Sequence, residues 1–228
     1  MSYKKRILSK TKETADKIFG TIVDELYWKF RHIRDKDWPK SYISSQSITH
    51  GHRIFLAGKI EKYLPLESVL EIGCSSGPNL YILANKFRKT KFYGTDISGN
   101  AIKVGKDFFN KNNLPNVVLN KGKAEDLSAF KDKSIDMIFT DAVLIYLGPD
   151  KINSVIKEML RVARKAIVMC EQNTNDSRGS IYNNHWLHNY GLLFSQFPSV
   201  KEIKKTKLPP SIWSGQWADS GYIIEVLL

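Results

Sequence analysis

The sequence predicts an α/β fold built on a doubly wound, mostly parallel sheet. Five short runs rich in β-branched or aliphatic residues alternate with stretches of helical spacing. This alternation is typical of βαβ units, because parallel neighbouring strands need a long right-handed crossover. A length of 228 residues suits one such unit, and the 42% hydrophobic and 25% charged composition excludes a disordered or fibrous protein.

The predicted strands lie at 68–72, 91–95, 116–120, 134–139 and 165–169. Helical spacing is clearest at Ile152, Val155, Ile156, Met159, Leu160 and Ala163, and is also present at Ala101, Ile102, Gly105, Phe108 and Phe109. Two late runs, 201–207 and 222–228, have no helix between them and predict an antiparallel addition at the sheet edge. Ligands of such sheets bind at the carboxyl ends of the strands.

Residues 1–67 are expected to form a helical extension that covers the domain of residues 68–228, a single globular unit. Helices are predicted from about residue 9 to 31 and from about 49 to 63. A break is expected at Asp37, Trp38 and Pro39, because the residue before proline disfavours helical backbone angles. Candidate buried positions of the first helix are Ile18, Ile22, Val23, Leu26, Trp28 and Phe30.

The formal net charge of +12 allows two interpretations, a polyanion binder or a lysine-rich solvated surface. Two cysteines, Cys74 and Cys170, are too few for a disulfide framework and predict a reducing compartment, the cytoplasm. The sequence has no secretory h-region and no apolar stretch of 18 residues, so neither secretion nor membrane spanning is expected.

The segment 69–80, VLEIGCSSGPNL, places a strand and two glycines directly before a helical stretch. Gly73 and Gly77 allow unusual backbone angles and close approach of a ligand, and the helix N-terminus adds its dipole. Ser75 and Pro78 stand where the dinucleotide fingerprint needs glycine, so NAD is disfavoured. Asp96 ends the second strand nineteen residues after Gly77, where a carboxylate can accept both hydroxyls of a ribose.

On these residues the sequence resembles the class I S-adenosylmethionine-dependent methyltransferases. LEIGCSSG is similar to their first motif, with Glu71, Gly73 and Gly77 in register, and YGTDIS is similar to the second, with Asp96 as the ribose acid. NKGKAEDL, at 120–127, resembles the adenine-side motif, and SIDMIFTDAVLIYL, at 134–147, resembles the strand and turn beside the methyl donor. The resemblance covers residues 65–172.

The resemblance implies a Rossmann-like fold and S-adenosyl-L-methionine as the cofactor. The residues expected to bind it are Glu71, Gly73, Cys74, Ser75, Gly77, Asn79, Asp96, Ile97, Lys123, Ala124, Glu125 and Asp141. Ser75 replaces the usual middle glycine, and Lys123 stands where an acidic residue is usual. Adenine recognition is therefore expected from backbone groups of Lys123 and Ala124 or from Glu125.

Methyl transfer to a hydroxyl or an ammonium needs a base near the carboxyl ends of the strands. The catalytic candidates are Asp141 and Tyr146, which follow the fourth strand, and His185, which follows the fifth. Asp141 has an alternative interpretation as a turn carboxylate. His188 is most simply a partly buried histidine at a helix start, and a zinc site shared with His185 lacks further ligands, so no metal is expected.

The resembling families often use such an N-terminal extension to cover the cofactor and to build the acceptor pocket. Here the extension carries Trp28, Phe30, Arg31, Trp38, Tyr42, His50, His52 and Arg53. Trp28 and Phe30 have a simpler interpretation, because at helical spacing they would pack against the domain.

The expected function is methyl transfer to a hydroxyl, carboxyl or amine of a small molecule or saccharide. The alternatives are an RNA or protein methyltransferase and a non-catalytic binder of S-adenosylmethionine. The turn after the fourth strand, Thr140 to Val143, lacks the Pro-Pro-aromatic pattern that enzymes methylating a flipped base share. The basic residues are scattered, without an aromatic-interleaved stripe, so nucleic acid is disfavoured as a partner.

Overall fold

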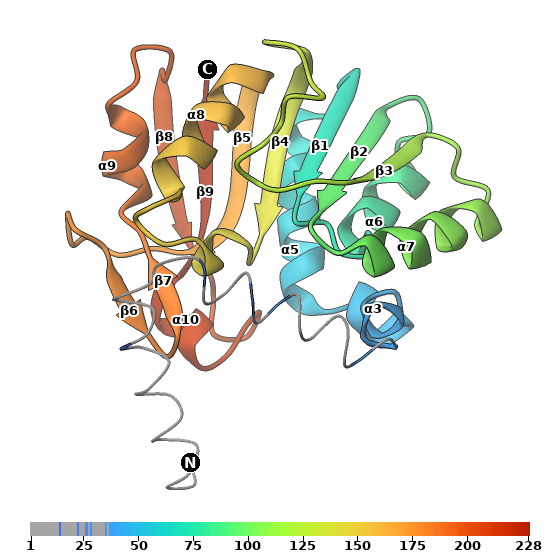
Figure 1. Cartoon of the computed structure of the whole chain (residues 1–228), viewed down its shortest axis with the longest axis horizontal. Coiled ribbons are helices and arrows are strands. Elements are labelled where there is room, and N and C mark those ends of the chain that lie inside the picture. Colours follow the sequence, from blue (N-terminus) through green and yellow to red (C-terminus); the bar gives the residue numbers. More distant parts are fainter. Residues whose placement is uncertain (1–13, 15–21, 23–25, 27, 29–34, 36) are drawn as a thin grey trace, which may run out of the picture.

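The computed structural model describes residues 14, 22, 26, 28, 35 and 37–228. Its centre is a seven-stranded sheet in the order β3-β2-β1-β4-β5-β9-β8 (Figure 1). The strands are β1 Ser68–Ile72, β2 Lys91–Asp96, β3 Val117–Lys121, β4 Ile135–Asp141, β5 Ala163–Gln172, β8 Glu202–Lys207 and β9 Gly221–Leu227. Strands β6 Ser180–Tyr182 and β7 His185–Leu187 pair in a separate small sheet.

The first five strands of the large sheet pair in parallel, and β9 pairs antiparallel with both β5 and β8. All seven predicted strands are present, which confirms the doubly wound, mostly parallel sheet with an antiparallel addition at one edge. The added pair is inserted so that β9 lies inside the sheet and β8 forms its edge. The expectation of no helix between the two strands was wrong, because the short helix α10 Gln216–Ser220 lies there.

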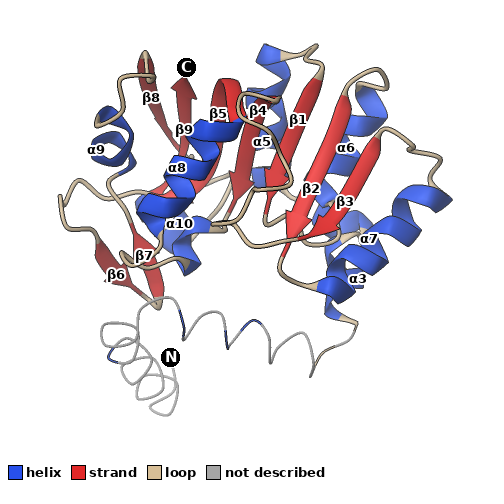
Figure 2. Ribbon diagram, turned by 45° about the horizontal axis from the view of Figure 1, so that its top comes forward, coloured by secondary structure: helices blue, strands red, loops and turns tan. Residues whose placement is uncertain are grey.

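Helices cover both faces of the sheet, as Figure 2 shows. They are α3 Trp38–Tyr42, α4 Ser45–Ile48, α5 Gly51–Ile60, α6 Pro78–Lys86, α7 Gly99–Lys111, α8 Ile152–Val162, α9 Tyr190–Ser195 and α10 Gln216–Ser220, with short 3₁₀ turns η1 Glu61–Tyr63 and η2 Leu144–Tyr146. Helices α5, α6 and α7 pack on one core, and α8 and α9 pack on the other. None of the helices described is long and apolar enough to cross a membrane.

Strand alternation divides the core between these two faces, because successive side chains of a strand point in opposite directions. In β1, Val69 belongs to the core under α5 and α6, whereas Leu70 belongs to the core under α8. Both side chains have no solvent exposure. A strand buried on both faces explains why its sequence is a continuous apolar run.

The N-terminal part contains one predicted helix in full, and of the helix predicted over about 9–31 the structure describes Thr14, Ile22, Leu26 and Trp28, which are all helical. The predicted helix at 49–63 is confirmed by α5 and η1, and α3 begins at the predicted break. Ile22 and Leu26, expected to be buried, are 57% and 48% exposed. Trp28 is half-buried instead, because a turn of about 100° per residue places it on a different side of a helix from Leu26. Ile18, Val23 and Phe30 lie outside the described residues.

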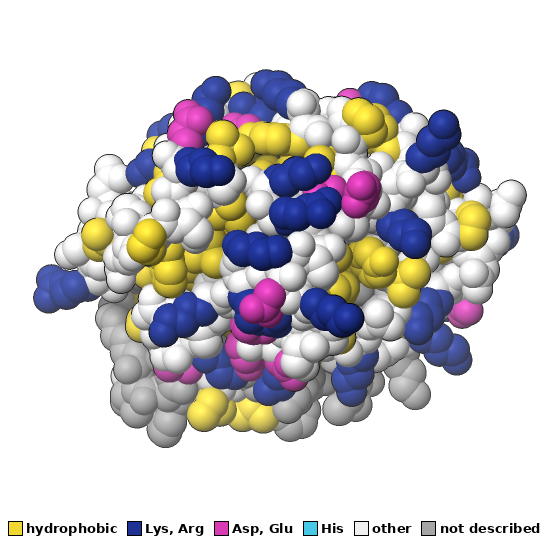
Figure 3. All heavy atoms as spheres, turned by 90° about the horizontal axis from the view of Figure 1, so that it is seen from above, with side chains coloured by type: hydrophobic (Ala, Val, Ile, Leu, Met, Phe, Trp, Pro, Cys, Tyr) yellow, Lys and Arg dark blue, Asp and Glu magenta, His cyan; other side chains and the backbone are white. Residues whose placement is uncertain are grey.

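Basic side chains are spread over the face at the amino ends of the parallel strands. The parallel strands start at the top of Figure 1 and end near α3, α10 and β7 at the bottom. Figure 3 views the top, where Lys and Arg are dispersed among polar and apolar side chains, with fewer acidic ones. Much of the basic charge therefore lies away from the carboxyl ends of the strands.

Candidate functional site

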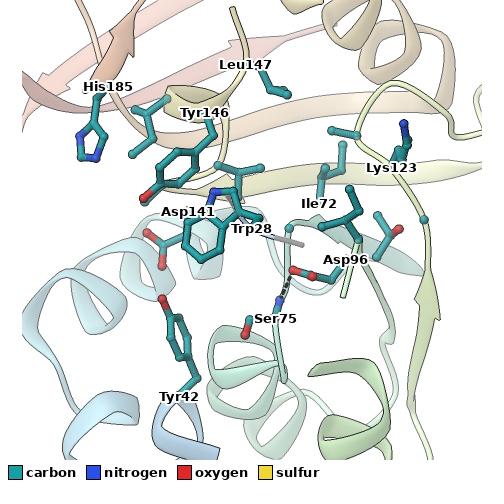
Figure 4. Close-up of a pocket in the computed structure, with 18 of the residues that line it drawn as sticks. Trp28, Tyr42, Ile72, Ser75, Asp96, Lys123, Asp141, Tyr146, Leu147 and His185 are labelled. Atoms are coloured by element: carbon teal, nitrogen blue, oxygen red, sulfur yellow. Dashed lines mark hydrogen bonds between the residues drawn. The ribbon is translucent and has the colours of Figure 1, made fainter. Parts of the chain in front are cut away.

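A cavity of about 410 Å³ lies at the carboxyl ends of β1, β2 and β4 (Figure 4). Eight of the predicted cofactor residues line it, namely Gly73, Ser75, Asp96, Ile97, Lys123, Ala124, Glu125 and Asp141. All three predicted catalytic residues, Asp141, Tyr146 and His185, line it too. Glu71, Cys74, Gly77 and Asn79 do not line the cavity and lie in or beside the loop that forms its floor.

The glycine loop connects β1 to α6 through three residues with left-handed backbone angles. Gly73 has φ 72°, and a Cβ at this position would overlap the side chain of Val143. Gly77 has φ 86° and caps the N-terminus of α6, where a Cβ would lie 2.6 Å from Phe109. Ser75 adopts φ 50°, so the serine takes the conformation that a middle glycine would adopt more easily.

Asp96, the last residue of β2, joins the glycine loop to the loop that follows its own strand. Its Oδ2 accepts a hydrogen bond from the Ser75 amide at 2.8 Å, and its Oδ1 accepts one from the Ser98 amide at 2.8 Å. Burial raises the pKa of Asp96, and the two backbone donors oppose that rise. Each oxygen keeps a further lone pair, so the held carboxylate can also accept ligand hydroxyls.

Asp141, the last residue of β4, accepts three hydrogen bonds on Oδ2. The donors are Arg53 Nη1 at 2.9 Å, Asn79 Nδ2 at 3.0 Å and His52 Nε2 at 3.1 Å. Burial alone would raise the pKa of Asp141, but the charges and hydrogen bonds of His52 and Arg53 hold it well below its usual range. Asp141 is therefore a carboxylate at neutral pH.

Glu71 and Asn79 support this carboxylate from behind. Asn79 Nδ2 also donates to Glu71 Oε1 at 2.7 Å, and Arg53 Nη1 donates to Asn79 Oδ1 at 3.0 Å. Glu71 is 1% exposed, and burial raises its pKa to about 8. The side chain is thus mainly protonated at pH 7, so it does not repel Asp141.

Several buried polar atoms around this cluster make no hydrogen bond within the protein. They include Asp141 Oδ1, Arg53 Nε and Ser75 Oγ, from residues that line the cavity. A buried polar atom without a partner costs free energy, about 1–3 kcal/mol. The site therefore offers a carboxylate oxygen, a guanidinium N–H and a hydroxyl to a polar ligand.

In the segment around Lys123, the carboxylate of Glu125 is paired with lysines. Glu125 Oε1 is 2.9 Å from Lys151 Nζ and 3.7 Å from Lys123 Nζ, so its carboxylate forms ion pairs with two lysines. Lys123 and Ala124 line the cavity beside it. The Glu125 carboxylate is thus already paired within the protein.

Tyr146 and His185 meet at the end of the cavity away from Lys123 (Figure 4). Their ring centroids are 5.5 Å apart in an edge-on contact, and Trp28 contacts Tyr146 at 4.9 Å. His185 belongs to β7, with Nδ1 3.3 Å from Gln172 Oε1. Asp141 belongs to a different cluster, the one around Arg53. The Tyr146–His185 pair and the Arg53–Asp141 cluster are therefore different parts of one cavity wall.

His188 lies just before the start of α9, close to the helix start expected for it, whereas His185 belongs to a strand. His185 belongs to β7, and His188 forms a β-bridge with Asn173, so the segment is extended. His188 is buried, its Nε2 is 2.8 Å from the Leu147 carbonyl, and burial lowers its pKa to about 4. Over the described residues, no group of three His, Cys, Asp or Glu is arranged to hold a metal ion.

The cavity wall contains tryptophans that the sequence did not single out. Trp213 and Trp217 stack with centroids 3.9 Å apart, and His52 stacks on the other face of Trp213 at 3.9 Å. The N-terminal extension adds Trp28, Trp38 and Tyr42. The sequence signal for Trp213 and Trp217 was only their place in a turn-rich segment, SIWSGQWADSG.

A doubly wound sheet with a glycine loop after β1 and a carboxylate at the end of β2 defines the class of nucleotide-cofactor-binding α/β domains. Residues 69–166 match the family model described as "Methyltransferase domain". This match agrees with the resemblance of the sequence to the class I S-adenosylmethionine-dependent methyltransferases. No curated protein matches the chain significantly.

Solved structures share the fold. A SAM-dependent methyltransferase from Aquifex aeolicus is 17% identical at a TM-score of 0.61, over 85% of this chain and 98% of that one. The PH0226 protein from Pyrococcus horikoshii OT3 is 18% identical at a TM-score of 0.63, over 81% and 92%. A geranyl diphosphate methyltransferase in complex with GPP and sinefungin is 12% identical at a TM-score of 0.60, over 77% and 76%.

Proposed function

We propose that the protein transfers a methyl group from S-adenosylmethionine to a hydroxyl, carboxyl or amine of a small molecule or saccharide. The observation that carries the proposal is a cavity that brings together the glycine loop, Asp96, Asp141 and His185. Cofactor groups and a candidate base thus share one cavity, as direct displacement requires.

The residues present fit the cofactor. Asp96 would accept the ribose hydroxyls, while Gly73 and Ser75 let the ligand approach the loop backbone. Asp141 Oδ1, buried and without a partner, suits the cofactor's ammonium group, and Arg53 Nε suits its carboxylate. The backbone of Lys123 and Ala124, with Ile97, would hold the adenine. Glu71, Asn79, Gly77 and Cys74 shape the loop from behind.

When bound, S-adenosylmethionine supplies an electrophilic methyl carbon, which the acceptor atom attacks while the carbon–sulfur electron pair remains on sulfur. His185 is positioned on the cavity wall to take the proton of a hydroxyl or ammonium acceptor. Tyr146 orients this end of the site through its edge contact with the His185 ring. The aromatic walls from Trp28, Trp213 and Trp217 exclude water around the reacting atoms.

Two observations favour a small acceptor over a polyanion. Six aromatic side chains line the cavity, those of Trp28, Trp38, Tyr42, Tyr146, Trp213 and Trp217. Basic side chains are dispersed over the face at the opposite ends of the strands (Figure 3). Two of the similar solved structures are named as a geranyl diphosphate methyltransferase and a coclaurine N-methyltransferase.

The extension and the domain would act together in this reaction. Trp38, Tyr42, His52 and Arg53 of residues 1–67 line the cavity beside the loops of residues 68–228. We therefore assign the first segment as a cover and the second as the catalytic unit, and the reducing cytoplasm as the compartment. The free, buried state of Cys74 and Cys170 supports that compartment.

The test is incubation of the full chain with methyl-labelled S-adenosylmethionine and a fractionated cell extract, with and without nuclease. Label in a small-molecule or glycan fraction, lost with Asp96→Ala, is the expected result. Nuclease-sensitive label would show that the acceptor is RNA and not a small molecule. Label in protein would show that it is a polypeptide. Cofactor binding without any S-adenosylhomocysteine release would overturn the enzymatic assignment.

A further inference from the structure

Three side chains and one backbone carbonyl form a connected polar group behind the cavity wall. Gln216 Nε2 is 2.7 Å from the Tyr182 carbonyl and 2.8 Å from Gln172 Oε1. His185 Nδ1 is 3.3 Å from Gln172 Oε1 and 3.3 Å from Gln216 Nε2. The group ties together the end of β5, the β6–β7 pair and the start of α10.

The Tyr182 carbonyl fixes the orientation of the Gln216 amide. A backbone carbonyl oxygen only accepts hydrogen bonds, so the amide nitrogen of Gln216 must face it, and a flipped amide would set two oxygens 2.7 Å apart. The second N–H of Gln216 points to Gln172 Oε1. Both protons of Gln216 Nε2 are then committed, and none remains for His185 Nδ1.

The Gln216 amide in turn fixes Gln172. Because a donor faces it at 2.8 Å, Gln172 must present its oxygen. Its own Nε2 is buried and makes no hydrogen bond, so the orientation is imposed by Gln216 and not by a partner of that nitrogen. Gln172 has no solvent exposure, which leaves no water-filled alternative for its amide.

The two glutamines therefore select the protonation of the imidazole. His185 Nδ1 lies near an acceptor, Gln172 Oε1, and near Gln216 Nε2, whose protons are used, so these two contacts favour the proton on Nδ1 of the neutral ring. Nε2 of the neutral ring is then the basic nitrogen. The ring lines the cavity, with Tyr146 against it on the side of η2.

We propose that Gln172 and Gln216 are positioning residues that hold His185 in the Nδ1–H tautomer, so that Nε2 takes the acceptor's proton during methyl transfer. The proposal rests on the proposed function, and its closing experiment separates the two. Neither glutamine lines the cavity. Each acts through the hydrogen-bond chain that begins at Tyr182.

The test is ¹⁵N NMR of the full chain labelled in its histidine rings, at a pH where the rings are neutral. His185 is identified by the signal lost in His185→Asn. The expected wild-type spectrum shows His185 as the Nδ1–H tautomer. His188 serves as an internal reference, because its Nε2 must donate to the Leu147 carbonyl and so carries the proton.

The variants separate positioning from packing. Gln172→Leu and Gln216→Leu should move His185 toward the Nε2–H tautomer. Gln172→Glu should keep the Nδ1–H tautomer, because its carboxylate accepts a hydrogen bond. The control Gln46→Leu, at an exposed position, should leave the tautomer unchanged. Turnover is measured with the acceptor that the labelling experiment identifies. It should fall about tenfold or more in the two Leu variants, and KM for the cofactor should not change. If Gln172→Leu does not fold, Gln216→Leu tests the same change in tautomer and turnover, because Gln216 is partly exposed.

Two results would overturn the proposal. One is a wild-type His185 signal of the Nε2–H form, and the other is an unchanged tautomer or unchanged turnover in folded Gln216→Leu. The spectrum needs neither cofactor nor acceptor. An Nδ1–H signal in a protein that transfers no methyl group would therefore reject the proposed function while the hydrogen-bond chain itself stands.

Discussion

Arg53 and Asp141 form a buried ion pair that joins α5 to the end of β4. Nη1 of Arg53 lies 2.9 Å from Oδ2 of Asp141, and the two side chains are 9% and 4% exposed. The residues are 88 positions apart in the chain, so the pair fixes the extension against the domain. The same carboxylate also receives Asn79 and His52, which makes it the junction of three elements.

Arg53→Met should lower the free energy of unfolding by about 3 kcal/mol, because removing one partner leaves a buried carboxylate poorly compensated. Chemical denaturation monitored by tryptophan fluorescence measures the change. Arg178→Met, at an exposed position, is the control and should stay within about 0.5 kcal/mol of wild type. Equal stability of the two variants would show that the Arg53 pair contributes little.

Asp96→Ala should weaken binding of S-adenosylmethionine by roughly a hundredfold or more. Two hydroxyl bonds to a charged acceptor would be lost, each worth about 1.5–3 kcal/mol, and about 1.4 kcal/mol corresponds to tenfold in affinity. Isothermal calorimetry measures the dissociation constant. Asp107→Ala removes an exposed carboxylate of α7 and should leave the affinity unchanged. An Asp96→Ala protein with wild-type affinity would refute the ribose assignment.

Gly77→Ala and Gly58→Ala should change stability in opposite directions. At Gly77 the added Cβ meets Phe109 at 2.6 Å and the backbone has φ 86°, so we expect a loss of about 1–3 kcal/mol. Gly58 lies inside α5 with no atom within 4 Å of a Cβ, so alanine should add about 0.5–1 kcal/mol. Thermal unfolding of both variants tests the contrast, and the same sign for both would contradict it.

Glu171→Gln should flatten the dependence of stability on pH. Burial raises the pKa of Glu171 to about 7, against the opposing hydrogen bonds from Val143, Leu144 and Thr140. Between about pH 4.5 and 7 the folded state binds more protons than the unfolded state, so the free energy of unfolding falls as pH rises.

The slope from this group is at most about 1.4 kcal/mol per pH unit. Gln keeps an oxygen for the three donors to Oε1 and does not titrate. Denaturant unfolding at pH 5 and pH 8 should therefore show a smaller loss in the variant than in wild type, by about 2 kcal/mol. Parallel stability profiles would show that Glu171 is ionised in the folded protein throughout this range.

The sheet and the cofactor loops could be predicted because their signals are local. Apolar runs mark buried strands whatever lies around them, and the position of Asp96 follows from the strand that ends there. In the site, this local logic placed Gly73, Ser75 and Asp96 on the cavity wall.

The rest depends on contacts between distant segments. The Arg53–Asp141 pair and the Gln172–Gln216 contact each join residues 44 or more positions apart, and no local pattern encodes them. The histidine segment was expected at a helix start, and no strand was predicted there. Pairing with Ser180–Tyr182 makes His185–Leu187 a strand instead.

Part of the excess of lysine over acidic residues lies on the edge strand β8, where it has a role that involves no ligand. It is an open edge of the sheet, and its residues Lys204, Lys205 and Lys207 are exposed along a strand of only six residues. An open edge offers unpaired amides and carbonyls to any other extended chain, and closely spaced lysines make such an approach repulsive. The charge at this edge therefore protects the protein from aggregating with copies of itself.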